Sequence, residues 1–314
     1  MRVFLNDQFI DASEARISPF DRGFLLGDAV YEGLRAHDRG IVALTEHLNR
    51  MRQGLRDIRI NFESHRLAQP TFDLLRENAL DSAFVYWHVS RGRPAPGFHA
   101  RARLPAAQIE PTVFGFATPI EPLSHEIPIQ SASGALVEDC RWTRGDLKAA
   151  TLLGSVLCAM EASDSGRDQA ILHRDGRVTE GVSTNVLVHS RGRFVTPVAE
   201  SGALLRGVTR DLLMGGDLGL VEDHVDIQML READEIMIVG TATLLVPITS
   251  LDGRPVGNGA VGPVATRARE RLIDVSIARC EREEEWHGRE DHRRDGGQHE
   301  HACGSIRPRR PDED

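Results

Sequence analysis

The chain has 314 residues, of which 40% are hydrophobic, and its formal net charge at pH 7 is −9. This length and apolar content can bury a sizeable core, most simply in two domains. The acidic balance, with no basic stripe to offset it, argues against nucleic acid as a partner. No apolar run approaches the roughly 20 residues that span a bilayer, which argues against a membrane protein.

The N-terminus and the cysteines indicate where the protein resides. Asn6, Asp7 and Gln8 interrupt the first ten residues too early for the apolar region of a signal peptide. The cysteines stand at positions 140, 158, 280 and 303, without the close pairing that metal ligands show. We expect a reduced, cytoplasmic protein with no metal site.

The first third of the chain mixes strand-like and helical patterns. Residues 2–10 predict a β-hairpin around the turn residues Asn6 and Asp7. Residues 45–58 place Leu48, Met51, Leu55 and Ile58 at helical spacing, with Thr45 as the N-cap. The aromatic and β-branched content of residues 84–90 predicts a strand.

A two-domain α/β (α+β) organisation follows from these patterns. Residues 1–118 form the first domain, and the proline-containing residues 119–126 form a linker. Residues 127–278 form a second, strand-rich domain, with strands at 186–189 and 235–239 and a helix over 149–163. Residues 279–314 carry eleven acidic residues and eight arginines with almost no apolar content, so we expect a disordered charged tail.

Lysine is almost absent from the chain. Arginine occurs thirty-seven times and lysine once, at Lys148. Arginine can replace lysine in most surface charges and ion pairs, but it cannot supply a primary amine that condenses with an aldehyde. Lys148 is therefore a candidate for covalent chemistry, and the alternative is a leftover surface cation.

Six motifs occur in order along residues 1–275, with the only lysine among them. Together they resemble the class IV pyridoxal-phosphate aminotransferases of fold type IV, which include D-amino-acid transaminases, branched-chain aminotransferases and aminodeoxychorismate lyase. The motifs are DRGFLLGDAVYEGLR (21–35), EHLNR (46–50), RWTRGDLKAATLLGSVLCAME (141–161), TEGVSTN (179–185), RGVTRD (206–211) and GTATLLVPI (240–248).

The resemblance implies a pyridoxal 5'-phosphate cofactor between the two domains. Lys148 would be the catalytic residue that joins the cofactor aldehyde and then moves the substrate proton. Glu180 would pair with the ring nitrogen, although a glutamate in a loop is usually a solvated charge. Arg50 would reach the phosphate from the first-domain helix.

The resemblance also implies further cofactor contacts. A turn at Val208 and Thr209 opens a helix whose backbone N–H groups favour phosphate, and Thr241 would add a hydroxyl. Arg141 would approach the phenolic oxygen and Leu205 the ring face; the alternatives are an exposed ion pair and a core leucine. Ser183 and Thr184 stand where branched-chain enzymes usually carry glycine and glutamate, so this segment favours the D-amino-acid transaminases.

The group that holds the substrate carboxylate stays open. Tyr31 matches the active-site tyrosine of the family. In the loop after Arg91, however, Pro96 and Phe98 occupy the positions of the arginine and histidine that clamp the carboxylate in D-amino-acid transaminases. The sequence leaves as candidates Arg35, His88, Arg93, His99 and Arg101.

Arg35 is the first choice for that role because it would share one strand face with Tyr31. An ion pair to Glu32 is the alternative for Arg35. Arg93 and Arg101 could be solvated loop charges, and His88 a strand residue facing the core.

The resemblance implies a transaminase that moves an amino group between an amino acid, D-alanine for example, and a 2-oxo acid. The alternatives are a branched-chain L-amino-acid aminotransferase and a lyase that releases pyruvate from aminodeoxychorismate. The loop after Arg91 would reach the active site of a second subunit, which implies a homodimer.

Overall fold

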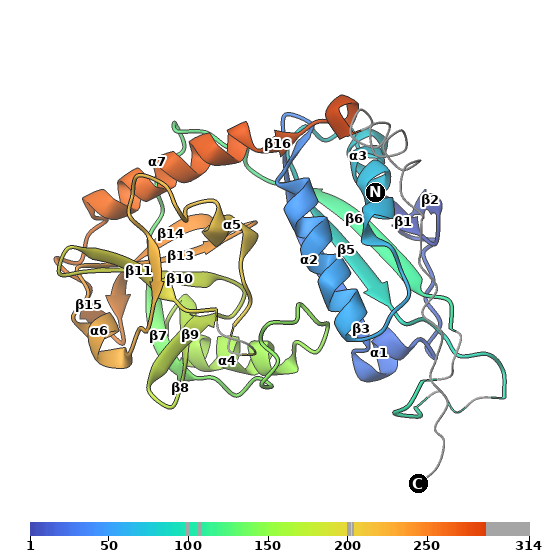
Figure 1. Cartoon of the computed structure of the whole chain (residues 1–314), viewed down its shortest axis with the longest axis horizontal. Helices are drawn as coiled ribbons and strands as arrows, with labels where there is room; N and C mark the ends of the chain where they lie inside the picture. Colours follow the sequence, from blue (N-terminus) through green and yellow to red (C-terminus); the bar gives the residue numbers. More distant parts are fainter. Residues whose placement is uncertain (98, 100, 106–108, 200–201, 203, 287–314) are drawn as a thin grey trace, which may run out of the picture.

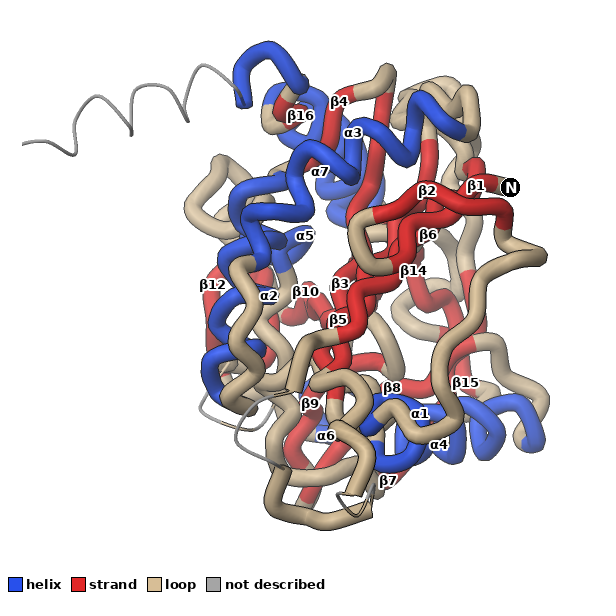
Figure 2. The backbone as a smooth tube through the Cα atoms, turned by 90° about the vertical axis from the view of Figure 1, so that its right-hand side faces the viewer, coloured by secondary structure: helices blue, strands red, loops and turns tan. Residues whose placement is uncertain are grey.

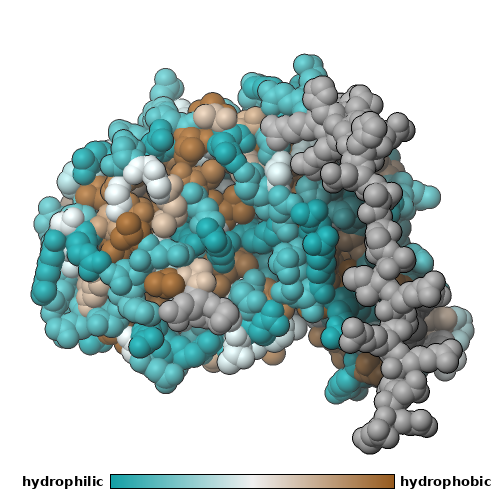
Figure 3. All heavy atoms as spheres, viewed as in Figure 1, coloured by the Kyte–Doolittle hydropathy of each residue, from teal (hydrophilic) through white to brown (hydrophobic). Residues whose placement is uncertain are grey.

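Two β-sheets, each with its own hydrophobic core, form the framework of the chain (Figure 1). The computed structural model describes residues 1–286 except 98, 100, 106–108, 200–201 and 203. No helix among these residues has both the length and the apolar character needed to cross a bilayer. The front face is mainly hydrophilic, with apolar residues in separate patches (Figure 3).

The first sheet has seven strands in the order β16-β4-β3-β5-β6-β1-β2. All its neighbouring strands pair antiparallel. Its elements are β1 (Arg2–Leu5), β2 (Gln8–Asp11), α1 (Arg22–Leu26), β3 (Ala29–His37), β4 (Gly40–Val42), α2 (Leu44–Asp57), the 3₁₀ helix η1 (Ser64–Leu67), α3 (Ala68–Glu77), β5 (Ala83–Ser90), β6 (Thr112–Pro119) and β16 (Cys280–Glu281).

The second sheet has nine strands in the order β12-β11-β10-β13-β14-β7-β8-β9, with β15 paired to β14. Parallel pairing occurs at β11–β12, β14–β7 and β7–β8. Its elements are β7 (Ala132–Glu138), α4 (Leu153–Asp164), β8 (Gln169–Arg174), β9 (Arg177–Gly181), β10 (Asn185–Ser190), β11 (Arg193–Pro197), α5 (Val208–Asp211), β12 (Val221–Asp223), α6 (Ile227–Arg231), β13 (Glu235–Gly240), β14 (Leu244–Leu251), β15 (Arg254–Pro255) and α7 (Pro263–Ala278).

Helix α2 covers one face of the first sheet, as its apolar spacing predicts. Leu48, Met51 and Leu55 are at most 1% exposed and pack into the core of that sheet. The predicted N-cap is wrong, because the helix begins at Leu44 and its N-cap is Ala43, in the left-handed region at φ 49°. The N-terminal turn is instead capped by a distant residue.

Helix α4 also begins later than expected. Residues 149–152 were expected to be helical, but the helix starts at Leu153. The backbone N–H of Ala150 donates to the carbonyl of Ala29 at 3.0 Å, and Ala149 forms a β-bridge with Val30. These bonds hold the segment after Lys148 extended against the start of β3.

The first residues of the expected tail differ from the prediction of disorder. Strand β16 returns to the first sheet beside β4 (Figure 2). Glu281 accepts hydrogen bonds from the backbone N–H of Thr45 at 2.8 Å and from its hydroxyl at 2.7 Å, which caps α2. Trp286 is 7% exposed and its ring stacks on His65. Residues 287–314 lie outside the described residues.

These contacts separate two truncations. Deletion of residues 279–314 should lower the free energy of unfolding by about 3 kcal/mol, because it exposes the surface that Trp286 covers and removes the Glu281 cap. Deletion of 287–314 alone should change it by less than about 0.5 kcal/mol. Chemical unfolding of both variants checks this, and equal midpoints would contradict a structural role for residues 279–286.

Candidate active site

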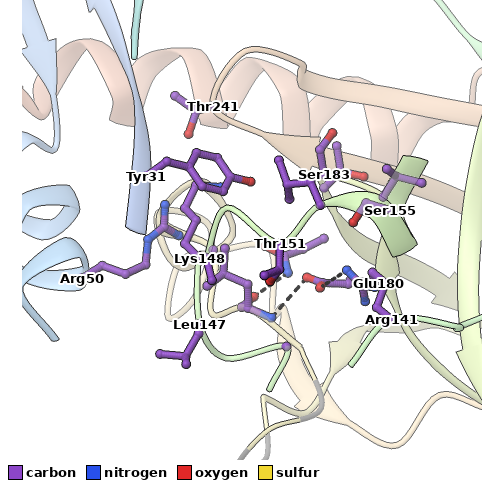
Figure 4. A pocket seen from close by; sticks show the side chains of 18 of the residues that line it. Tyr31, Arg50, Arg141, Leu147, Lys148, Thr151, Ser155, Glu180, Ser183 and Thr241 are labelled. Carbon is purple, nitrogen blue, oxygen red and sulfur yellow. Dashed lines mark hydrogen bonds and ion pairs between the residues drawn. The ribbon is translucent and has the colours of Figure 1, made fainter. Parts of the chain in front are cut away.

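A cavity of about 100 Å³ lies between the two sheets and contains the side chain of Lys148 (Figure 4). Most of the residues singled out from the sequence line it. They are Tyr31, Arg50, Arg141, Lys148, Glu180, Ser183, Thr184, Leu205, Val208, Thr209 and Thr241. The sequence interpretation gave no role to other lining residues, among which Trp142, Thr151, Ser155 and Asn185 are polar or aromatic.

Lys148 is held against the first sheet by its own backbone. Its carbonyl accepts a hydrogen bond from the backbone N–H of Tyr31 at 3.0 Å. The ammonium nitrogen lies 4.4 Å from the centre of the Tyr31 ring, close enough for a cation–π contact. The two residues therefore reach the cavity as a pair, from adjacent extended segments.

One end of the cavity is cationic. Arg50, on α2, donates through Nε and Nη2 to the two carboxylate oxygens of Glu32, at 3.0 and 2.7 Å. Its Nη1 donates to the carbonyl of Arg206 at 3.0 Å. Burial alone would lower the pKa of Arg50, but the adjacent Glu32 charge outweighs it and the net pKa is raised. The guanidinium therefore remains charged at this end.

The loop before α5 completes the cationic end. A Cβ on Gly207 would lie 1.8 Å from the side-chain oxygen of Asn185, so no side chain fits there. Asn185 in turn donates to the carbonyl of Leu205 at 2.8 Å. Val208 and Thr209 open α5, and the first N–H groups of a helix have no acceptor within it. Asn185 belongs to the TEGVSTN motif, so the motif marked this position without indicating its role.

The other end of the cavity is a buried set of charges. Arg141 donates through Nη1 to Glu180 at 2.7 Å and through Nε to Asp139 at 2.9 Å. The second carboxylate oxygen of Glu180 accepts the backbone N–H of Leu205 at 3.2 Å. Burial raises the pKa of Glu180, and the Arg141 charge opposes that rise. A carboxylate in this setting suits a protonated partner in the cavity.

Arg35 lies outside the cavity, which contradicts its predicted contact with the substrate. Its guanidinium donates to the backbone carbonyls of Thr241 at 3.3 Å, Ala242 at 3.1 Å and Glu121 at 2.6 Å. The alternative is also wrong, because Glu32 pairs with Arg50 and His47 instead. Arg35 shares a strand face with Tyr31 as expected, but its donors point to the linker and to the 241–242 turn.

The other carboxylate candidates are more dispersed. His88 pairs with Tyr31 in the β3–β5 register, and its Nδ1 lies 3.3 Å from the hydroxyl of Tyr86. It does not line the cavity, and it is half-buried rather than a core residue. Arg93, His99 and Arg101 are exposed on the loop after β5. Phe98, in the same loop, lies outside the described residues.

The sheet face beside Tyr31 is aromatic. The rings of Tyr31 and Tyr86 stack with their centres 5.7 Å apart, and Tyr86 lies 5.2 Å from Phe116. Phe114 continues the row, 5.9 Å from Phe116. The side of the cavity formed by the first sheet therefore adjoins a ring-lined surface.

The described residues contain no group of three or more histidine, cysteine or acidic side chains that could hold a metal ion. The lining instead combines an amine, a cationic end with hydroxyl and backbone N–H donors, and a buried carboxylate. This donor set fits a phosphorylated heterocyclic aldehyde, and in particular the pyridoxal phosphate that the motifs imply.

Comparison with known proteins agrees with the motifs. The model of the amino-transferase class IV family matches residues 29–251. D-alanine aminotransferase of Staphylococcus haemolyticus is 33% identical over 280 residues, covering 86% of this chain and 95% of that protein. A putative branched-chain-amino-acid aminotransferase of Methanocaldococcus jannaschii is 31% identical over 287 residues, covering 88% of this chain and 96% of that protein.

Solved structures agree on the fold. The branched-chain aminotransferase of Thermoproteus uzoniensis with norvaline has a TM-score of 0.76 at 25% identity, covering 91% of this chain and 97% of its own. The branched-chain amino acid aminotransferase of T.th., complexed with N-(5'-phosphopyridoxyl)-L-glutamate, has a TM-score of 0.77 at 27% identity, covering 90% and 96%. The fold is that of fold type IV, and the chain belongs to the class IV aminotransferases.

Proposed function

We propose that this enzyme is a pyridoxal-phosphate-dependent transaminase that moves an amino group between an amino acid and a 2-oxo acid. The observation that carries the proposal is the position of Lys148, the only lysine of the chain, between Arg50 and Glu180 in one cavity. When bound, the cofactor supplies an aldehyde and an electron-withdrawing ring.

The residues of the chain divide the work by position. Arg50, Thr241 and the backbone at Val208 and Thr209 would hold the phosphate, because they gather donors at one end of the cavity. Glu180 would face the ring nitrogen and keep it protonated, since its carboxylate is fixed by Arg141 and by the N–H of Leu205.

Leu205 would pack against the ring, while Ser183 and Thr184 line the side of the second sheet. The amine of Lys148 would take the proton from the substrate Cα and return it at the end of the transfer.

We infer a D-amino acid such as D-alanine as the donor. The support is the identity of 30–33% to D-alanine aminotransferases of staphylococci, together with Ser183 and Thr184 in the motif. The second candidate is a branched-chain L-amino acid, favoured by the relative from Methanocaldococcus jannaschii at 31% and by solved branched-chain enzymes at 23–27% identity. Release of pyruvate from aminodeoxychorismate is the third reaction to test.

We further propose that the working unit is a homodimer. Helix α4 exposes a row of apolar side chains, which on a monomer would be an unusual cost in hydration. Leu153 is 71% exposed, Met160 55%, and Val156 and Leu157 50% each. The exposed cations Arg93, His99 and Arg101 would then serve the partner's cavity, as the family resemblance implies.

The protein would act in the cytoplasm, and the domain boundaries at residues 118, 126 and 278 are part of the same interpretation. The ends of β6 at Pro119 and of α7 at Ala278 agree with two of these boundaries. The segment 279–286 is the exception, because it contacts the first sheet again.

Lys148→Arg should abolish transamination while leaving the protein folded. Arginine keeps the positive charge but cannot join an aldehyde covalently or carry the substrate proton. No other lysine exists to replace it. We expect a loss of at least about a thousand-fold in kcat and loss of the lysine-bound cofactor absorbance. Residual turnover within tenfold of the unmodified enzyme would rule out the assignment.

Arg35→Ala should weaken the reaction of all substrates alike. The side chain supports the 241–242 turn and the linker, and its loss leaves three backbone carbonyls without a charged donor, which costs about 2–3 kcal/mol of stability. Reactions of D-alanine and of an amine without a carboxylate should fall by similar factors. The exposed Arg101→Ala in the same protomer serves as the control for stability.

A rise in KM confined to amino acids, with an unchanged melting temperature, would restore Arg35 as the carboxylate ligand.

A substrate panel decides between the three reactions. The enzyme is incubated with D-alanine, L-leucine or aminodeoxychorismate, with 2-oxoglutarate as acceptor, and the cofactor spectrum is followed. We expect D-alanine to convert the cofactor to its amine form at least tenfold faster than L-leucine. Faster conversion by L-leucine identifies the branched-chain activity, and pyruvate release without an oxo acid identifies the lyase.

A further inference from the structure

Two cysteines that the mechanism does not use lie side by side at the edge of the site. The sulfur atoms of Cys140 and Cys158 are 3.5 Å apart. Cys140 follows the end of β7 and is exposed, whereas Cys158 lies on the buried face of α4 and is 1% exposed. A disulfide needs its sulfur atoms about 2.05 Å apart, so side-chain rotation and a small approach would join them.

The surroundings of both sulfurs fix them in this arrangement. Cys140 donates its thiol hydrogen to the carbonyl of Gly154 at 3.6 Å, and Cys158 donates to the carbonyl of Glu138 at 3.8 Å. Each thiol therefore hydrogen bonds to the backbone of the segment that carries the other. Cys158 also packs with Ala135, among the apolar residues of β7, β8 and α4.

The two cysteines enclose the catalytic segment in the sequence. Residues 141–157 contain Arg141, Lys148 and Ser155, all of which line the cavity. The Cα of Arg141 lies only 3.0 Å from the position that a Cβ on Gly154 would take, so the segment packs tightly where it meets α4. A bond between Cys140 and Cys158 would close this segment into a loop.

We propose that Cys140 and Cys158 form a reversible disulfide that closes the lysine-bearing segment 141–157 into a covalent loop, with a hydroperoxide as the oxidant. This modification concerns the thiols alone and does not rest on the proposed substrate. It is a site at which peroxide stress would tighten the segment that carries Lys148.

The chemistry runs in two steps. The Cys140 thiolate attacks one oxygen of hydrogen peroxide, the O–O bond breaks, and water leaves, which gives a sulfenic acid at Cys140. The sulfur of Cys158 then attacks that of Cys140, the S–O bond breaks, and a second water carries away the Cys158 proton. Two thiols lose two hydrogens and the peroxide is reduced to two waters.

The order of the steps follows from exposure. Cys140 reaches solvent and can meet the peroxide, while Cys158 is enclosed by α4 and β7. Burial raises the pKa of the Cys158 thiol, so it is the poorer first nucleophile and the natural partner for a sulfenic acid already formed beside it.

The disulfide should stabilise the segment because it shortens the unfolded chain's accessible loop. The two cysteines are 18 positions apart, and closing a loop of this length should raise the melting temperature by roughly 5–10 °C. Amide hydrogen exchange in residues 141–157 should slow by at least about tenfold, because the segment can no longer open independently of α4.

The experiment uses the full chain with its cofactor and a background variant in which Cys280 and Cys303 are changed to serine. Only the proposed pair then remains. After treatment with hydrogen peroxide and removal of the excess, we expect a mass 2 Da lower, loss of both free thiols, the higher melting temperature, and reversal by dithiothreitol.

Two further variants on this background serve as controls. Cys140→Ser and Cys158→Ala should each abolish the loss of 2 Da, the rise in melting temperature and the slowed exchange. Oxidation of Cys140 to sulfinic or sulfonic acid, a disulfide between two chains, or a disulfide that leaves exchange and melting temperature unchanged would each overturn the proposal.

Discussion

Two backbone hydrogen bonds between the start of β3 and the segment around Lys148 bring the two halves of the site together. Tyr31 donates to the carbonyl of Lys148, and Ala150 donates to the carbonyl of Ala29, both at 3.0 Å. The bonds belong to the backbone, so they fix the segment whatever side chains it carries. The amine and the aromatic ring therefore meet at 4.4 Å before any cofactor or substrate adds its own contacts.

The charges of the site are arranged as two buried groups on opposite sides of Lys148. Glu32 is fully buried with Arg50 and His47, and although burial would raise its pKa, these two neighbours outweigh burial and hold the pKa well below its usual range. Arg141 is held in the same way between two carboxylates. Unpaired buried charges would cost several kcal/mol, so each group is stable only as a complete set. The positions of the arginines are thus fixed in advance of ligand binding.

The sequence predicted the parts of this design that depend on local pattern. The spacing of Leu48, Met51 and Leu55 identified the buried face of α2, and the order of motifs identified the cofactor side of the cavity. It could not predict the cap of α2, because Glu281 and Thr45 are 236 positions apart. It also misplaced Arg35, since the acceptors of that guanidinium are backbone carbonyls, which leave no mark on residue identity.

The near absence of lysine is tolerated because arginine makes bonds that lysine cannot make. Arg91 donates to both oxygens of Asp28 and, beyond them, to the carbonyls of Ile58 and Arg59. A planar guanidinium supplies these directions from one side chain, whereas an ammonium has three donors on a single atom. Exchange of lysine for arginine at such sites costs little stability. At position 148 the same exchange would remove the one atom able to bond an aldehyde carbon, so a chain that favours arginine elsewhere still requires lysine there.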